Sequence, residues 1–290
     1  MSKIALGTAQ FGMSYGIANK YGKLKLQDIK KIIEFAKKKK IDLIDTAISY
    51  KNSEKTIGKI GILDFKIVSK LPYLPKKEIL DINSWVREQI KLSLIRLRVK
   101  SLCGILIHNS QDLNGEIGKR IIDTLHNLKS KGIVEKIGIS IYDPNEFEKF
   151  KKLINFDIIQ APLNILDRRI LDSGLLSKFY KTNVEFHARS VFLQGLLLMS
   201  KQDRPSKFNK WSNLWKLWHE WLNDNKIKPL EAAIRYVLSI KEVSKVIVGV
   251  ESKDQLKQIL EASNGKLPNI PNELAMNDIN LLNPSNWSKI

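Results

Sequence analysis

Short apolar runs of strand length alternate with longer amphipathic stretches from one end of this chain to the other. The apolar runs lie near residues 4–6, 41–44, 67–68, 104–107, 137–139, 156–159, 184–188 and 246–248. The stretches between them have a helical period, and Val86, Ile90, Leu94 and Leu97, for example, fall on one helical face. A repeated strand and helix pattern of this kind predicts an α/β fold in which helices cover a parallel sheet.

Eight such units without a break in composition favour one closed (β/α)8 barrel, the TIM barrel, over an open doubly wound sheet. An open sheet that binds a dinucleotide usually carries a Gly-x-Gly-x-x-Gly turn after its first strand. Here the first run leads into Gly7-Thr-Ala-Gln-Phe-Gly12, which has a different spacing. We therefore predict a single domain over residues 1–290, with a lengthened connection at 199–229 and a C-terminal tail from about residue 264.

The composition argues against several other classes of protein. The single cysteine, Cys103, allows no intrachain disulfide and suggests no zinc cluster, so we expect no metal. The sequence begins without the long apolar core of a signal peptide, and no apolar stretch approaches the roughly 20 residues that span a bilayer. We expect a cytoplasmic protein with no membrane partner.

The chain carries a formal net charge of +19 at pH 7. Such an excess can indicate nucleic acid, an acidic membrane surface or an anionic small ligand. The lysines lie mostly in helix-like segments, as at 37–40 and 149–152, and a solvated helix surface accounts for most of them. We expect no nucleic-acid partner, because interleaved aromatic and basic residues are missing outside residues 211–221. An anionic substrate or cofactor is compatible with the charge.

Nearly every predicted strand ends on a polar or small residue. The eight ends are Thr8, Asp45, Lys70, His108, Ser140, Gln160, Ser190 and Gly249. In a barrel these positions ring the mouth at which active sites of this fold lie. Loops often begin with polar residues, so each end alone is a weak signal. The full set, which includes an Asp, a Lys and a His, predicts a functional site.

Asp45, Tyr50, Lys70 and His108 form the central part of this predicted site. A free tyrosine is a poor acid at neutral pH, but a neighbouring ammonium such as that of Lys70 would lower its pKa. Asp45 would hold the lysine by a charge-assisted hydrogen bond, and His108 would donate to a substrate oxygen. Taken singly, each residue has an ordinary structural interpretation. Asp45 would be a helix cap and Tyr50 a wall residue, Lys70 would be solvated, and His108 would bond a loop carbonyl. Together they predict a phenol that protonates a carbonyl oxygen while hydride reaches the carbon.

These residues and several short motifs resemble the aldo-keto reductases. The motifs, in chain order, are Gly7-Thr-Ala-Gln-Phe-Gly12, Asp45-Thr-Ala-Ile-Ser-Tyr50, Ser69-Lys-Leu-Pro72, Leu106-Ile-His108, Lys131-Gly-Ile-Val-Glu-Lys-Ile-Gly-Ile-Ser140, Gln160-Ala-Pro-Leu-Asn164, Phe192-Leu-Gln-Gly-Leu-Leu197 and Val248-Gly249. The resemblance implies NAD(P)H-dependent reduction of an aldehyde or ketone, with a sugar or an anionic metabolite among the candidate substrates. It implies Tyr50 as proton donor, Lys70 and Asp45 as the pair that tunes it, and His108 as the residue that orients the carbonyl.

The resemblance also implies a nicotinamide cofactor at the same mouth. The implied contacts are Gly7, Thr8, Asp45, Ser140, Gln160, Arg189, Ser190, Phe192, Gly249 and Gln255. Ser140 and Gln160 would hold the carboxamide, and the segment from Ser190 would wrap the pyrophosphate. Three positions depart from the family pattern: Arg189 replaces an aromatic residue, Ile141 replaces an Asn after the serine of the fifth strand, and Ile259 replaces an Asn that commonly contacts adenine. Arg189 could stack on a ring or pair with a phosphate.

The choice between NADH and NADPH depends on the segment after the last strand. The resemblance implies that this segment holds the adenosine end of the cofactor, where Glu251 would repel a 2′-phosphate and Lys253 could attract it. The sequence favours NADH slightly. A nicotinamide-binding regulatory protein on the same scaffold is the alternative function, and the presence of all four catalytic residues favours the enzyme. No motif indicates the natural substrate or the oligomeric state.

The lengthened connection contains Trp211, Trp215, Trp218 and Trp221, whose spacing places them on one helical face. A basic amphipathic helix with tryptophans can lie on a membrane surface. Glu220 and Asp224 dilute the basic face. We therefore expect this helix to pack against the barrel, with a lid over the substrate as the next alternative.

Overall fold

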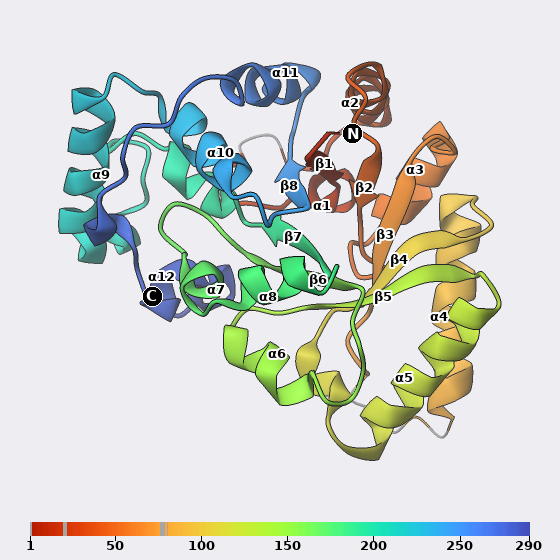
Figure 1. The fold of residues 1–290 in the computed structure, drawn as a ribbon. Coiled ribbons are helices and arrows are strands. Elements are labelled where there is room, and N and C mark those ends of the chain that lie inside the picture. The colour runs from red at the N-terminus through yellow and green to blue at the C-terminus, as the bar shows by residue number, and fades with distance from the viewer. Residues whose placement is uncertain (1, 20–21, 76–78, 80) are drawn as a thin grey trace.

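A closed parallel barrel forms the centre of the molecule in the computed structural model, which describes residues 2–19, 22–75, 79 and 81–290 (Figure 1). Its strands are β1 (Ile4–Gly7), β2 (Leu43–Asp45), β3 (Lys66–Leu71), β4 (Leu102–Ile107), β5 (Val134–Ser140), β6 (Ile158–Pro162), β7 (Glu185–Arg189) and β8 (Lys245–Gly249). Each strand pairs in parallel with its sequence neighbours, and β1 pairs with β8 to close the barrel. The predicted (β/α)8 fold is confirmed.

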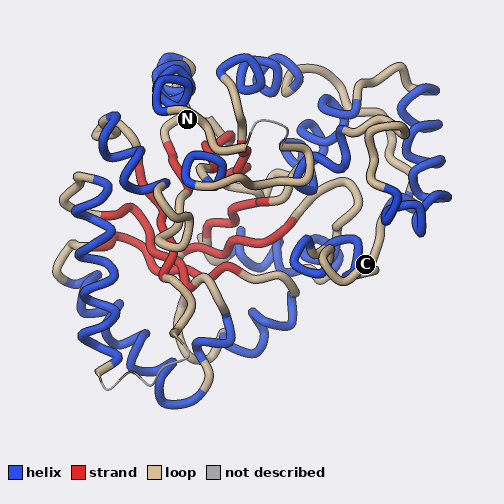
Figure 2. The backbone as a smooth tube through the Cα atoms, turned by 180° about the vertical axis from the view of Figure 1, so that it is seen from behind, coloured by secondary structure: helices blue, strands red, loops and turns tan. Residues whose placement is uncertain are grey.

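The helices surround these strands, as the view from behind in Figure 2 shows. The α-helices are α1 (Ala9–Gly12), α2 (Leu26–Lys38), α3 (Ser53–Ile60), α4 (Ile82–Leu97), α5 (Gly115–Ser130), α6 (Pro144–Phe150), α7 (Arg169–Asp172), α8 (Leu175–Lys181), α9 (Ser212–Asp224), α10 (Pro229–Ser239), α11 (Lys253–Ala262) and α12 (Ile279–Leu282). The 3₁₀ helices are η1 (Ser110–Leu113), η2 (Leu193–Leu198), η3 (Ser206–Trp211), η4 (Asn272–Leu274) and η5 (Pro284–Asn286).

Alternate residues of the strands contribute to two separate apolar clusters. The smaller cluster comprises Ala5, Leu43, Val68, Leu106, Ile158 and Ile247. Their sequence neighbours, such as Ile44, Ile67 and Ile105, belong to the large cluster that also includes the helices. Because side chains alternate across a strand, the small cluster fills the barrel and the large one joins its outside to the helices. This packing holds the strands in register and so determines which side chains meet at the mouth.

The tryptophan stripe of η3 and α9 faces the protein. Trp211, Trp215, Trp218 and Trp221 are all buried. The indole N–H of Trp218 donates to the Leu197 carbonyl at 3.3 Å, and the other three indoles also donate to protein oxygens. The stripe is buried in the protein, so the membrane-surface alternative is wrong for it. The prediction named the barrel as the packing surface, whereas the indole partners lie in η2, in η3 and in the segment after α11. Within the described residues, no helix combines the length and the apolar character that a membrane crossing needs.

Candidate active site

The carboxyl ends of the strands converge on one mouth, where the register places Gly7 beside Asp45 and Gly249, and Ser140 beside Gln160. A cavity of about 360 Å³ opens there, and we call it the reaction chamber. Its lining includes the four predicted catalytic residues, Asp45, Tyr50, Lys70 and His108. It also includes the predicted cofactor residues Gly7, Thr8, Ser140, Gln160, Arg189, Ser190, Phe192 and Gly249. The strand ends therefore bring together nearly all of the predicted site.

A second cavity, of about 250 Å³, lies beside the reaction chamber, and we call it the outer groove. The two cavities share the lining residues Gln10, Tyr15, Phe192, Gln194 and Gly249. The outer groove adds Glu251, Gln255 and Ile259 among others, so it extends from the chamber towards α11. Gln255, which does not line the chamber, is therefore placed in the adjoining groove.

Lys70 and Asp45 form a buried ion pair at the floor of the reaction chamber. The Lys70 Nζ lies 2.6 Å from Asp45 Oδ1 and also donates to the Thr46 carbonyl at 2.8 Å. The Gln160 amide donates to the second oxygen of Asp45 at 2.7 Å. Lys70 is fully buried and Asp45 nearly so. Both oxygens of the acid have donors, which is the condition under which a buried charge pair is tolerated.

The Tyr50 phenol lies next to this pair. The Lys70 Nζ is 5.3 Å from the centroid of the Tyr50 ring. Burial raises the pKa of Tyr50, and the negative charge of Asp45 raises it further, while Arg189 opposes the shift. The predicted lowering of this pKa by Lys70 is therefore wrong for the free protein, because burial of the phenol and the negative charge of Asp45 outweigh the effect of the ammonium. Tyr50 is a fully protonated phenol at neutral pH.

His108 contributes a neutral imidazole to the chamber. Burial lowers the pKa of His108 to about 3, and the charges of Lys70 and Arg189 add to this shift. Its Nδ1 lies 3.1 Å from the Ser49 hydroxyl. The ring stacks on Tyr73 with centroids 5.1 Å apart and meets Tyr50 edge-on at 6.0 Å. A neutral ring has one N–H to donate, and its partner at Nδ1 decides which nitrogen carries that proton.

Several chamber residues were missed by the sequence analysis. They are Ser49, which contacts His108, and the aromatic residues Tyr15, Tyr73 and Tyr142 of the chamber wall. All four come from segments that follow a strand, namely β1, β2, β3 and β5. Their position in these loops was a usable signal, because the loops at the carboxyl ends of barrel strands form the active-site mouth. Nothing in the residue types separated them from ordinary loop residues.

Two features of the β6 and β7 side of the chamber suit a polar ligand. The Oε1 atom of Gln160 is buried without a hydrogen-bond partner in the described part of the protein. After β7 the backbone takes left-handed conformations at Ser190 (φ 57°), Leu193 (φ 47°) and Gln194 (φ 53°). Such conformations are strained for residues other than glycine, and they cluster at ligand clamps. An unpaired buried acceptor is costly until a donor reaches it.

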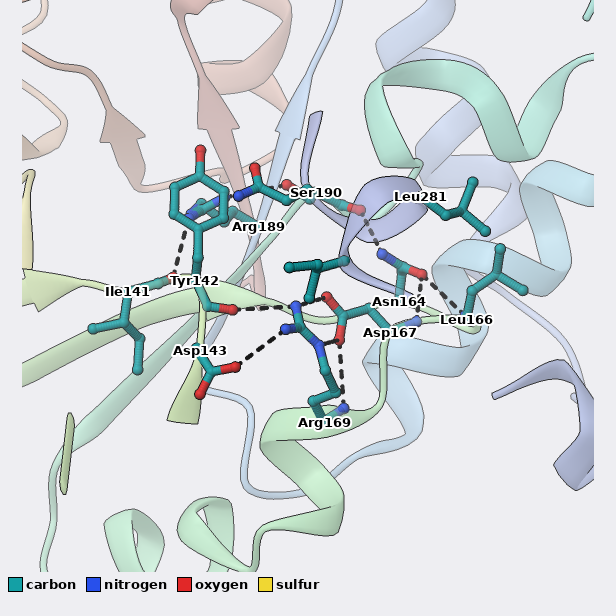
Figure 3. A network of polar contacts seen from close by, with 12 residues as sticks. Ile141, Tyr142, Asp143, Asn164, Leu166, Asp167, Arg169, Arg189, Ser190 and Leu281 are labelled. Carbon is teal, nitrogen blue, oxygen red and sulfur yellow. Dashed lines mark hydrogen bonds and ion pairs between the residues drawn. The ribbon is translucent and has the colours of Figure 1, made fainter. Parts of the chain in front are cut away.

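Arg189, at the end of β7, stacks on an aromatic residue of its own chain. Its guanidinium carbon lies 4.0 Å from the centroid of the Tyr142 ring. One of its nitrogens donates to the Ile141 carbonyl at 3.0 Å, and the other approaches the Ser190 hydroxyl at 3.4 Å. Figure 3 shows this arrangement beside the network of Arg169. This contact with Tyr142 was not predicted, and the two predicted roles of Arg189 toward a cofactor ring or a phosphate stay predictions.

In the outer groove, Glu251 is the one charged residue among the described lining residues. Its backbone N–H donates to the Gln255 side chain at 2.7 Å, and burial raises the pKa of the Glu251 carboxyl. Lys253 lies outside this lining, and its Nζ is 5.9 Å from the Phe35 ring centroid. The buried Ile259 forms part of the apolar wall. Over the described ranges, no group of three His, Cys, Asp or Glu residues could hold a metal ion.

Fold and site together define a (β/α)8 barrel whose carboxyl mouth holds a buried Lys70–Asp45 pair, Tyr50 and His108 in one chamber, with an adjoining groove. The model of the aldo/keto reductase family matches residues 3–271 of this sequence. The chain belongs to the aldo/keto reductase family, a family of NAD(P)H-dependent oxidoreductases. The resemblance seen in the sequence motifs is thereby confirmed.

Known proteins are similar to the chain at low sequence identity. The uncharacterized oxidoreductase YqkF of Bacillus subtilis (strain 168) is 25% identical over 198 residues, which cover 63% of this chain and 62% of that protein. The aldo-keto reductase AKR11C1 from Bacillus halodurans, in its holo form, has a TM-score of 0.73 and 22% identity, with 92% of this chain and 88% of that one covered. The glycerol dehydrogenase AKR11B4 from Gluconobacter oxydans has a TM-score of 0.69 and 21% identity, with coverage of 93% and 88%.

Proposed function

We propose that this protein is an enzyme that reduces an aldehyde or a ketone at the expense of NAD(P)H. The observation that supports this most directly is the protonated Tyr50 phenol beside the buried Lys70–Asp45 pair and the neutral His108 in one chamber. Family membership supports the same activity. The glycerol dehydrogenase among the structural relatives is consistent with alcohol and carbonyl chemistry.

The residues of the β5 to β8 side fit a nicotinamide cofactor. The Oε1 atom of Gln160, which has no hydrogen-bond partner among the described residues, can accept from the carboxamide N–H₂, with Ser140 as its neighbour across the strand pair. The loop that begins at Ser190, together with Phe192 and Gly249, borders both cavities and would hold the pyrophosphate. When bound, the cofactor supplies the hydride. Thr8 acts indirectly, because its hydroxyl donates to the Asp45 carbonyl at 3.0 Å.

The side chains of this protein would supply the proton and fix the carbonyl oxygen. Tyr50 gives its hydroxyl proton to that oxygen, and the ammonium of Lys70 stabilises the phenolate that forms. The Ser49 hydroxyl lies 3.1 Å from Nδ1 of His108. In this proposal the hydroxyl donates to Nδ1, which leaves the Nε2 proton to donate to the same carbonyl oxygen. Asp45 holds Lys70 in place. The raised pKa of Tyr50 keeps the phenol protonated in the free protein, so the proton is present when the carbonyl substrate binds.

NADH is the cofactor that the outer groove favours in this proposal. Glu251 would place a negative charge near a 2′-phosphate, and Lys253 packs over Phe35 instead of lining the groove. A carboxylate that faces a phosphate without a cation between them disfavours NADPH.

The proposal is tested by the loss of reduced-nicotinamide absorbance with a panel of aldehydes, ketones and keto sugars. Tyr50→Phe should lower kcat/KM for the best substrate by about 100-fold or more, because general acid catalysis contributes roughly 10²- to 10⁴-fold. The NADH dissociation constant, measured by tryptophan fluorescence, should change little. Tyr180→Phe, which removes the hydroxyl of an exposed tyrosine on α8, is the matched control. Normal turnover by Tyr50→Phe would disprove the proton-donor role.

A further inference from the structure

One positive charge in the reaction chamber has no acidic partner among the residues that the structure describes. The charged residues of the lining are Asp45, Lys70 and Arg189. Asp45 and Lys70 neutralise each other across 2.6 Å, and burial keeps His108 uncharged at neutral pH. Among the described residues, no carboxylate lies within ion-pair distance of Arg189, whose hydrogen bonds go to the Ile141 carbonyl and the Ser190 hydroxyl. The chamber therefore keeps a net charge of about one positive unit.

A neighbouring arginine, Arg169, differs from Arg189 because it is held by ion pairs within the protein (Figure 3). Arg169 forms ion pairs with Asp167 at 2.8 Å and with Asp143 at 3.4 Å. Its guanidinium also donates to the Tyr142 carbonyl at 3.2 Å. Asp143 and Asp167 thus both pair with Arg169. Arg189 lies at the chamber wall. Within the described part of the protein, its contacts are with neutral groups: the Ile141 carbonyl, the Ser190 hydroxyl and the Tyr142 ring.

The position of Arg189 is fixed in advance of any ligand. The Tyr142 ring covers one face of its guanidinium, and Tyr142 itself is held by Arg169 at its carbonyl and by Glu146 at its N–H. The positive charge also lies close to the catalytic groups, since it contributes to lowering the pKa of His108 and opposes the rise in the pKa of Tyr50. A prepositioned, unpaired guanidinium binds an anion with little loss of conformational entropy.

We propose that Arg189 is a specificity-determining residue that binds the carboxylate or phosphate of an anionic carbonyl substrate, while the carbonyl oxygen faces Tyr50 and His108. This inference rests on the proposed reductase function. The guanidinium presents N–H groups in a plane that matches two carboxylate oxygens. A phosphate of the cofactor offers the same chemistry, and the experiment below separates the two sources.

The experiment compares substrates that differ in charge alone: 2-, 3- and 4-carboxybenzaldehyde and their methyl esters, with NADH. In the natural sequence we expect kcat/KM to be higher for at least one acid than for its ester. Arg189→Met should lower this acid-to-ester ratio by about 10- to 100-fold, which corresponds to losing a hydrogen bond to a charged group. Arg189→Lys should give an intermediate ratio. Arg87→Met, which removes one exposed positive charge from α4, should leave the ratio unchanged.

A binding measurement distinguishes the substrate from the cofactor as the source of the anion. Benzoate, titrated calorimetrically into the NADH complex, should bind the natural protein and bind Arg189→Met about 10-fold more weakly or worse. If Arg189→Met changes acids and esters equally while NADH binding weakens by the same factor, Arg189 serves the cofactor and the inference is wrong. If no aldehyde is reduced by any variant, the reductase proposal fails, and the benzoate titration still decides whether Arg189 binds a carboxylate.

Discussion

The two halves of the barrel mouth differ in whether their charged side chains form ion pairs. On the β2 to β4 side, Lys70 and Asp45 are in direct contact, and each oxygen of the acid has a donor. On the β5 to β8 side, Arg189 and Glu251 lie in separate cavities, and neither has an oppositely charged partner in the lining that the structure describes. The first side is complete in the free protein. The second leaves charges for a ligand to match, so we assign chemistry to the first and recognition to the second.

The largest expected effect is a loss of stability when the Lys70–Asp45 ion pair of the β2 to β4 side is broken. Lys70→Met leaves the Asp45 carboxylate buried without its cation, which should lower the free energy of unfolding by about 3–5 kcal/mol. Denaturant unfolding measures this loss. Lys91→Met, which breaks an exposed pair with Glu88, should cost about 1 kcal/mol or less. If the two variants lost equal free energy of unfolding, the buried Lys70–Asp45 pair would contribute no more to stability than the exposed Lys91–Glu88 pair.

Gln160 joins the two sides, because its amide donates to Asp45 and its Oε1 has no partner among the described residues. Gln160→Met should lower the free energy of unfolding by about 1–3 kcal/mol and weaken NADH binding by about 10-fold. Unfolding curves and NADH titrations measure the two effects. Gln258→Met, at an exposed position of α11 that borders the outer groove, is the control for stability. A loss of stability with unchanged NADH affinity would show that Gln160 supports Asp45 and does not bind the cofactor.

The pH dependence of unfolding tests whether His108 is held neutral in the folded protein. Its pKa is about 3 in the folded protein and 6.5 in the unfolded one, so the unfolded chain binds the extra proton as pH falls below 6.5. The contribution of His108 to stability is fully present above pH 6.5 and is lost progressively towards pH 3. Between pH 7.5 and 5, the natural protein should lose about 2 kcal/mol more than His108→Gln. Parallel loss in both proteins would show that His108 is not held neutral.

The smallest expected effect concerns the unmatched charge of the outer groove. Glu251→Gln should shift the ratio of NADPH to NADH affinity towards NADPH by about threefold, since the carboxylate is partly solvated. Fluorescence titration with both cofactors measures the ratio. Glu261→Gln, on the exposed side of α11, should leave it unchanged. A clear preference of the natural protein for NADPH would contradict the role given to Glu251.

The sequence alone predicted the fold and the strand-end residues that line the chamber, but not the loop residues Ser49, Tyr15, Tyr73 and Tyr142. The alternation of apolar runs with helical periods determines which residues can be buried, and that pattern is sufficient for a closed barrel of eight strands. Because parallel strands end at one mouth, the polar residues that terminate them, such as Asp45, Lys70 and Gln160, had to gather there. Local pattern and topology are enough for these conclusions.

The tertiary structure decided how these groups behave. It reverses the expected shift in the pKa of Tyr50, stacks Arg189 on Tyr142, and turns Lys253 towards Phe35. Each result depends on exclusion of water and on distances between segments far apart in the chain, and neither quantity is encoded in local sequence. Electrostatic energies vary steeply with both burial and separation. For this reason the residue types at the mouth were predictable, whereas their charge states and partners were not.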